Sequence, residues 1–348
     1  MQSSSRTSFA GGLAWPRTLL IIDAFASIYL LWGSTYFAIA LGLKSIPPFL
    51  LMALRSFCGG LILVAVNRRR IIELSSRDWL NATLCGLLFF VGCHGTLAYA
   101  QQMVSSGVAA IILATIPFWI LLIDWLFPQG KRPSPVTLLA LAPGFFGVGL
   151  VAWQDTSESG SAVVPTVLLL GAACSWSIAT VLSRGTSSDR PATLISGAQL
   201  LIGGATLFTI SLIAGELQSF SPARMSATSL EAALYLIIAG SVIGFAAYRW
   251  LLSNVPTSLV STYTFVNPII AVLLGVYVLG EPFSPMMLLG TCVIVISVAA
   301  MWFSEHFAHE ARAKEDRLAC NHFLRAGKTL NCAGRQPRMI EQNKARRA

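Results

Sequence analysis

The stretch that most constrains the fold runs from residue 257 to residue 303, because it holds two long apolar segments joined by a very short connector. The segments read TSLVSTYTFVNPIIAVLLGVYVLGE and PMMLLGTCVIVISVAAMWF, and the connector reads GEPFSP. About 20 apolar residues, at 1.5 Å each, cross a hydrocarbon core of about 30 Å. A soluble core helix of this length needs a polar face, and neither segment has one. We therefore predict a transmembrane hairpin.

The composition extends this prediction to most of the chain. Of the 348 residues, 55% are hydrophobic and only 11% are charged, against about 25% charged in a typical soluble domain. Ten apolar runs can be marked, near 19–42, 47–66, 79–99, 106–127, 135–153, 164–184, 192–214, 230–252, 257–278 and 285–303. The sequence therefore predicts an all-α integral membrane protein with ten transmembrane helices.

An internal repeat relates the two halves of the chain. Residues recur at a displacement of 144, namely Trp32, Arg55, Gly59 and Gly60 as Trp176, Gln199, Gly203 and Gly204. Tyr99 recurs as Tyr248 at a displacement of 149. Because five spans is an odd number, the second copy must enter the membrane from the opposite side, which predicts two inverted five-helix repeats with the solute between them. The predicted parts are an N-terminal arm (1–17), the first repeat (18–153), an external loop (154–163), the second repeat (164–303) and a basic tail (304–348).

The basic residues predict the orientation. The net charge is +9, and 10 of the 24 Lys and Arg lie beyond Ser304. The others gather in alternate loops, so the positive-inside rule places both termini in the cytoplasm and the protein in the plasma (inner) membrane. Basic residues in loops and a tail do not indicate nucleic-acid binding. The seven Cys lack metal-binding spacing, so we expect no metal and no cofactor.

Two stretches carry a family resemblance. TYTFVNPIIAVLLGVYVLGEPFSPMMLLGTCVIVIS and LLWGSTYFAIALGLKSIPPFLLMALRSFCGGLIL resemble the end of the second repeat and the opening of the first repeat in EamA-type permeases of the drug/metabolite transporter superfamily. The likeness covers roughly residues 20 to 303 and rests on fixed Trp-Gly, Arg, Pro and Gly-Glu positions. It implies a permease that exports a small polar metabolite, an amino acid or a related compound, by alternating access.

Arg55 is the most informative candidate site residue. It lies eight positions beyond Pro47, about 12 Å along a helix. A charge at that depth normally faces a cavity or a partner. Arg55 either contacts an anion or carboxylate in the cavity, or holds a backbone carbonyl or helix end. Since the resemblance places an Arg here across many substrates, it implies a role in the transport cycle rather than in selectivity.

Aromatic and polar residues complete the predicted cavity. Aromatic rings suit zwitterionic or amphipathic solutes through stacking and cation–π contacts, whereas the alternative is ordinary helix packing or an interfacial belt. The candidates are Trp32, Tyr36, Arg55, His94, Tyr99, Trp176, Gln199, Tyr248, Tyr263 and Asn267. A membrane histidine can titrate near neutrality, which would allow His94 to couple transport to protons; the alternative is a hydrogen-bonded core residue.

Glu281 ends the ninth predicted span in the family's Gly-Glu pattern, and we expect it to bond backbone groups at the helical turn. The corresponding turn of the first half, PQGKRPSP, contains no acid.

Two rival functions belong to other classes. A polytopic membrane enzyme acting on lipid would need a cluster of carboxylates or histidines near an interface, and the chain offers scattered acids and one intramembrane histidine. A membrane sensor would use the basic tail as its output, but no signalling domain is present. No GxxxxGK[ST] loop occurs, so direct drive by ATP is not expected. The expected partners are a small-molecule solute and the lipid bilayer.

Overall fold

A computed structural model describes residues 17–126, 139, 142–144, 146–148, 150, 163–184, 190–297, 299–300 and 303. All regular elements within these residues are helices. The predicted N-terminal arm, external loop and basic tail, and most of the fifth span, lie outside the described residues or at their edges. The described parts of the fifth span, including 142–144 and 146–148, are helical.

The first repeat follows the predicted order of spans. Its helices are α1 (Arg17–Gly42), α2 (Pro48–Val66), the 3-10 helix η1 (Arg68–Glu73), α3 (Ser76–Gly86), the π-helix η2 (Leu87–Gly95), α4 (Thr96–Ala100), α5 (Ser106–Leu113) and α6 (Ile116–Leu126). The third predicted span is thus one continuous rod of α3, η2 and α4. The fourth is interrupted just before Pro117, whose missing N–H is harmless in the first turn of the restarted helix α6.

The second repeat has the same plan. Its helices are α8 (Val163–Arg184), α9 (Ala192–Ile213), α10 (Glu216–Ser219), η3 (Pro222–Arg224), α11 (Ala227–Tyr235), the π-helix η4 (Leu236–Ile243), α12 (Gly244–Asn254), α13 (Thr257–Val260), α14 (Tyr263–Leu274) and the π-helix η5 (Gly275–Leu279). A further apolar helix spans Pro285–Ser297.

The helix lengths and compositions match a membrane protein. Seven helices are long and apolar enough to cross a bilayer, and two more, Tyr263–Leu279 and Pro285–Ser297, are apolar but shorter. Each of the nine coincides with a predicted apolar run. Large apolar side chains such as Leu30, which is 62% exposed, face outward, as lipid contact requires. The prediction of an all-α integral membrane protein is confirmed.

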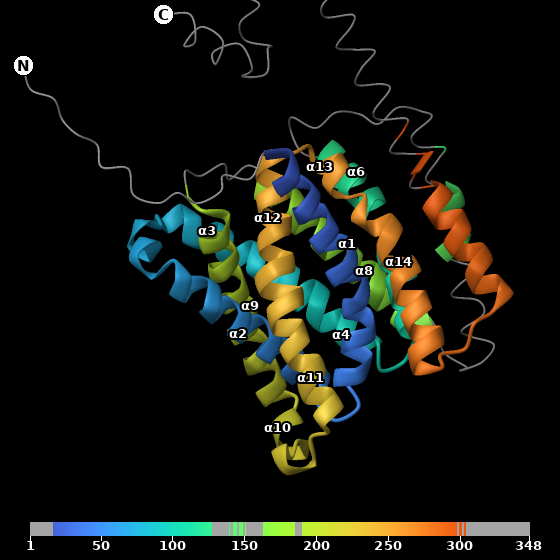
Figure 1. Cartoon of the computed structure of the whole chain (residues 1–348), viewed down its shortest axis with the longest axis horizontal. Coiled ribbons are helices and arrows are strands. Elements are labelled where there is room, and N and C mark those ends of the chain that lie inside the picture. Colours follow the sequence, from blue (N-terminus) through green and yellow to red (C-terminus); the bar gives the residue numbers. More distant parts are fainter. Residues whose placement is uncertain are drawn as a thin grey trace, which may run out of the picture.

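The helices α2 and α9, one from each repeat, pack side by side (Figure 1). A Cβ added to Gly60 would lie 2.6 Å from the backbone N of Leu201, and one added to Gly204 would lie 2.4 Å from the backbone N of Phe57. The displacement of 144 relates Phe57 to Leu201, just as it relates Gly60 to Gly204. Reciprocal contacts of this kind require a local two-fold axis. The displacement therefore marks a true inverted repeat, and the small residues allow the close approach.

The π-helical segments repeat as well. The segment η2 begins at Leu87 and η4 begins at Leu236, and these two positions differ by the same displacement as Tyr99 and Tyr248. Both segments lie at the centre of their spans, and π-helical turns often occur at functional sites.

We name the two ends of the bundle by their contents. The basic end carries η1 and the loop with Arg190. The far end carries the start of α2, the end of α9 and α10. In Figure 1, α3 lies toward the basic end and α10 lies at the far end.

Candidate functional site

A small cavity lies between the two repeats. Its lining comes from α1, α2, η2, α4, α5, α6, α8 and α14, and consists of Trp32, Thr35, Tyr36, Arg55, Cys93, His94, Leu97, Leu113, Ile116, Trp176, Tyr263 and Asn267. The cavity is small, with a volume of about 30 Å³.

Arg55 reaches this cavity from α2. The residue is 2% exposed, and its Nε donates to Oγ of Ser241 at 3.2 Å. Ser241 lies in the π-helical segment η4, and the neighbouring Gly240 is a glycine where a Cβ would lie 3.0 Å from Nη2 of Arg55. Among the described residues no carboxylate pairs with Arg55. Within the part of the chain that the structure describes, a buried cation thus lines the cavity without a counter-ion.

Aromatic rings form the wall beside this cation. The ring centroids of Trp32 lie 5.4 Å from Trp176 and 5.1 Å from Tyr263, both in edge-to-face geometry. The indole Nε1 of Trp32 donates to the carbonyl of Gly240 at 3.0 Å. Counterpart residues of the two repeats, Trp32 and Trp176, therefore meet at the cavity, as the two-fold axis requires. Edge-to-face rings present a fixed surface for a cation or a planar group.

Three polar atoms in the lining have no hydrogen-bond partner among the described residues. They are Nδ1 of His94, Nε1 of Trp176 and Oδ1 of Asn267, and all three are buried. The ring of His94 lies 5.5 Å from that of Trp176. Buried polar groups without a partner are costly and normally mark a ligand, a water or strain. The cavity thus combines a cation, an amide acceptor and an imidazole within one aromatic wall.

Seven of the ten predicted cavity residues line this space: Trp32, Tyr36, Arg55, His94, Trp176, Tyr263 and Asn267. Three do not. Tyr99 is 44% exposed and stacks on Phe49 with ring centroids 5.8 Å apart. Tyr248 packs behind the wall, against Trp32 at 5.0 Å, and its hydroxyl pairs with that of Thr180 at 2.7 Å. Gln199 is fully buried between helices, and neither Oε1 nor Nε2 has a partner among the described residues.

Five lining residues were not predicted from the sequence, namely Thr35, Cys93, Leu97, Leu113 and Ile116. Thr35 and Cys93 are the chain neighbours of the predicted Tyr36 and His94, so helix geometry could have suggested them. Leu113 and Ile116 lie at the interruption between α5 and α6, and Pro117 was the signal for it. Within the described ranges, no group of three His, Cys, Asp or Glu could hold a metal ion.

The amide N of Glu281 donates to the carbonyl of Gly275 in its own turn at 3.0 Å, whereas its carboxylate contacts another helix. Its carboxylate accepts from the amide N and Oγ of Ser106, at 2.9 and 2.8 Å, and from the amide N of Gly107 at 3.4 Å. These groups form the start of α5, where backbone N–H groups have no helical partner.

Comparison with known proteins agrees with this architecture. The sequence profile of the EamA-like transporter family matches residues 20–153 and again 165–303. The inner membrane transporter YedA of Escherichia coli (strain K12) is 33% identical over 291 residues, which are 83% of this chain and 92% of that protein. The transporter YoaV of Bacillus subtilis (strain 168) is 24% identical over 275 residues, 78% of this chain and 93% of that protein.

One solved crystal structure is similar in fold. It covers 82% of this chain and 98% of its own, with a TM-score of 0.59 at 20% identity. The two successive matches of one family profile coincide with the two inverted repeats seen around the Gly60 and Gly204 contacts. This chain therefore belongs to the EamA-like transporter family, as its sequence predicted.

Proposed function

We propose that this protein is an inner-membrane permease that exports a small polar metabolite, an amino acid or a related compound, by alternating access around the central cavity. The observation that carries the proposal is the guanidinium of Arg55, which is buried in the cavity wall without a carboxylate among the described residues. A buried charge without a counter-ion is costly, so a solute that supplies an anion is favoured there.

The rest of the lining suits the other end of a zwitterion. An ammonium group can lie over the rings of Trp32, Trp176 and Tyr263 and donate to the unpaired Oδ1 of Asn267. The apolar Leu113 and Ile116 offer space to an uncharged side chain. Arg55 then binds the carboxylate with its planar fork of donors.

The small volume supports alternating access. The cavity is small in this structure, and we infer that the two repeats separate to admit an amino acid. The inverted repeats supply two equivalent ways to do so, one toward each side of the membrane. His94, with its unpaired Nδ1, is the residue that would exchange a proton with the solute or the cavity water.

Arg55 provides the sharpest test. Arg55→Lys keeps the charge but loses the bidentate fork, so we expect normal membrane insertion with transport of the solute reduced about tenfold or more. Arg55→Leu should insert and lose transport. Arg69→Lys is the matched control, because Arg69 is exposed in η1. The assay is efflux from cells loaded with a panel of amino acids, with membrane content measured in parallel.

Transport by Arg55→Leu at the wild-type rate would refute this role for the cavity. A panel of neutral polar solutes and sugars, run beside the amino acids, separates a wrong solute class from a wrong site. If the wild type transports a non-zwitterionic solute and Arg55→Leu loses that transport, the proposed site is supported and the proposed solute class is wrong.

The orientation is part of the proposal. We propose that the basic end faces the cytoplasm and that both termini lie there. Reporter fusions test this directly: cytoplasmic activity is expected after Arg70, Arg132 and Ser304, and external activity after Glu158 and Pro282. Cytoplasmic activity after Glu158 would contradict the ten-span topology.

A further inference from the structure

At the far end, a carboxylate of the second repeat binds the start of a first-repeat helix. Glu216, the first residue of α10, accepts from the amide N of Phe49 at 3.1 Å and of Leu50 at 2.8 Å. Ser211 orients it by donating from Oγ at 2.7 Å. These amides form the first turn of α2, where N–H groups lack helical partners and the helix dipole favours a negative charge. Glu216 therefore ties α2 to the corner between α9 and α10.

Glu216 has a counterpart at the basic end. The displacement of 144 that relates α2 to α9 also relates Glu216 to position 72, and Glu73 is the next residue. It is the last residue of η1, which follows α2 as α10 follows α9. The N-cap residues also correspond, because Pro47 precedes α2 and Pro191 precedes α9, and the same displacement relates these two prolines. By the two-fold relation, the equivalent of the Glu216 contact is Glu73 on the first amides of α9.

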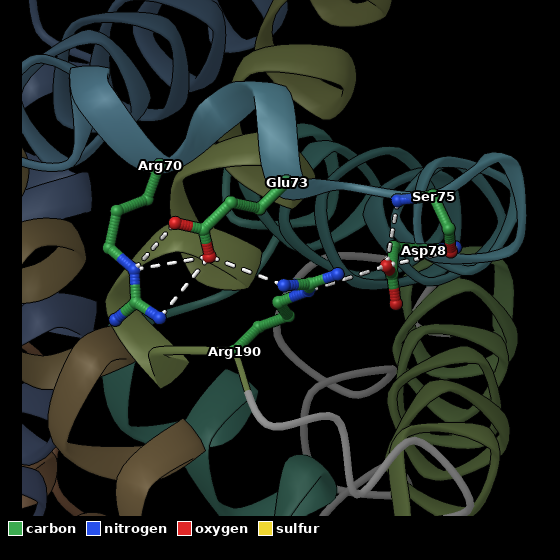
Figure 2. Close-up of polar contacts among 5 residues, drawn as sticks. All are labelled: Arg70, Glu73, Ser75, Asp78 and Arg190. Carbon is green, nitrogen blue, oxygen red and sulfur yellow. Dashed lines mark hydrogen bonds and ion pairs between the residues drawn. The ribbon is translucent and has the colours of Figure 1, made fainter.

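That equivalent contact is not made in this structure. Glu73 instead lies between two arginines, at 3.2 Å from Arg70 and 3.2 Å from Nη1 of Arg190 (Figure 2). Arg190 also lies 4.0 Å from Asp78. Among the described residues, no carboxylate reaches the amides at the start of α9. Yet Glu73 is held beside that start, because Arg190 stands two residues before Ala192, where the helix begins.

The two ends therefore differ in how the repeats are joined. The far end is joined through backbone amides, to Glu216 at α2 and to Glu281 at α5. At the basic end, η1 and the end of α2 make polar contacts to α9 and its preceding residues only through exposed or half-buried side chains in the described residues, Glu73 with Arg190 and Asn67 Nδ2 with Thr193 Oγ1 at 3.1 Å. Such surface pairs hold weakly. A small apolar cluster packs beside them, formed by Leu74, Ala82, Leu194, Ile195 and Ala198. In this structure the carboxylate–amide contact between the repeats is thus made by Glu216 at the far end, whereas Glu73 at the basic end pairs with arginines.

We propose that Glu73 and Glu216 are a matched pair of gating residues, each of which closes one end of the transporter in one state of the cycle. Inverted repeats produce the second state by exchanging the conformations of their two halves. Glu216 then releases Phe49 and Leu50, while Glu73 leaves the arginines and accepts from the first amides of α9. The inference rests on the proposed alternating access, but it does not depend on which solute is carried.

The native thiol of Cys93 supplies the readout, because it lines the cavity and is 1% exposed in this structure. A variant that keeps Cys93 and replaces the other six cysteines is labelled with a membrane-impermeant thiol reagent. Right-side-out and inside-out vesicles give the labelling rate from each side. The ratio of the far-end rate to the basic-end rate measures which state is populated.

The two variants should move this ratio in opposite directions. Glu216→Gln removes the negative charge that contacts the start of α2, so the ratio is expected to rise about tenfold. Glu73→Gln removes the negative charge that would contact the start of α9, so the ratio should fall by a similar factor. Glu231→Gln is the matched control, because Glu231 is an exposed acid in α11 at the same far end. We expect no change in that variant.

Shifts in the same direction, or no shift in Glu216→Gln, would overturn the proposal. If Glu216→Gln does not fold, Ser211→Ala replaces it, since that variant only removes the hydrogen bond that orients Glu216. It should raise the ratio by a smaller factor, and an unchanged ratio would count against the pair. Labelling needs no solute, so a wrong solute class leaves these results intact. If labelling is unchanged in both gating variants while transport still depends on Arg55, the gating proposal is refuted and the proposed function is not.

Discussion

Replacing Gly204 by alanine should separate the two helices at the symmetry axis. The added Cβ would lie 2.4 Å from the backbone N and 2.7 Å from Cα of Phe57. Optimal carbon contacts lie at about 3.5–4.0 Å, so α9 must move by roughly 1 Å. Because the opposing atoms are backbone, no side-chain rotation can relieve the clash. Overpacking of this kind costs about 1–3 kcal/mol, from which a helix-propensity gain of about 1 kcal/mol is subtracted.

A second glycine isolates the steric effect. Gly171 lies in α8 and a Cβ added there meets nothing within 4 Å. Gly171→Ala should therefore gain about 1 kcal/mol from propensity alone. Gly204→Ala is expected to lose up to about 2 kcal/mol, so the two variants should differ by as much as about 3 kcal/mol. Thermal unfolding of both proteins in one detergent measures the difference.

The reciprocal contact offers a further check. Gly60→Ala makes the equivalent clash with the backbone of Leu201, at 2.6 Å. Since both substitutions push the same two helices apart, the double variant should lose less than the sum of the single losses. If Gly204→Ala were as stable as Gly171→Ala, the close contact of α2 and α9 would be wrong.

Three other substitutions have defined outcomes. Gln199→Met should raise the free energy of unfolding by about 1–3 kcal/mol, measured by thermal unfolding, because it removes two buried amide atoms without partners. Trp32→Phe leaves the carbonyl of Gly240 without its donor and should slow transport more than it lowers membrane content. Hydrogen bonds from Arg70 lower the pKa of Glu73, so the stabilising contact is present above the ordinary Glu pKa and is lost as pH falls through the lowered value. The stability difference between wild type and Glu73→Gln, measured by unfolding across pH, should accordingly vanish in acid.

The architecture could be predicted from the sequence because the residues that recur between the two halves include large and infrequent ones. Trp32 and Trp176 define the displacement between the halves, and the structure brings these two residues into contact. Arg55 could be identified as a buried residue because a charge in a hydrophobic span has few alternatives. Nine of the ten spans coincide with described helices for the same reason, since apolar length alone specifies a crossing.

The details of the cavity were harder to predict. Tyr99 was included because it has the repeat partner Tyr248, but the two halves differ here, since Tyr99 is exposed and Tyr248 is buried. Pro117 indicated the interruption beside Leu113 and Ile116, but apolar periodicity did not separate these two residues from lipid-facing ones, because every face of such a span is apolar. The role of Glu216 depends on the start of α2, which lies far away in sequence. No local sequence pattern predicts that contact.

The recurring π-helical turns bear on how the molecule arose. A π-helical turn contains an extra residue relative to an α-helix, so each one records an insertion into a regular span. Here η2 and η4 begin at equivalent positions, Leu87 and Leu236, in the two halves. Two independent insertions at one register are less economical than one. The insertion is therefore placed before the gene duplication that produced the two halves, in an ancestor of five spans whose copies had to meet in opposite orientations.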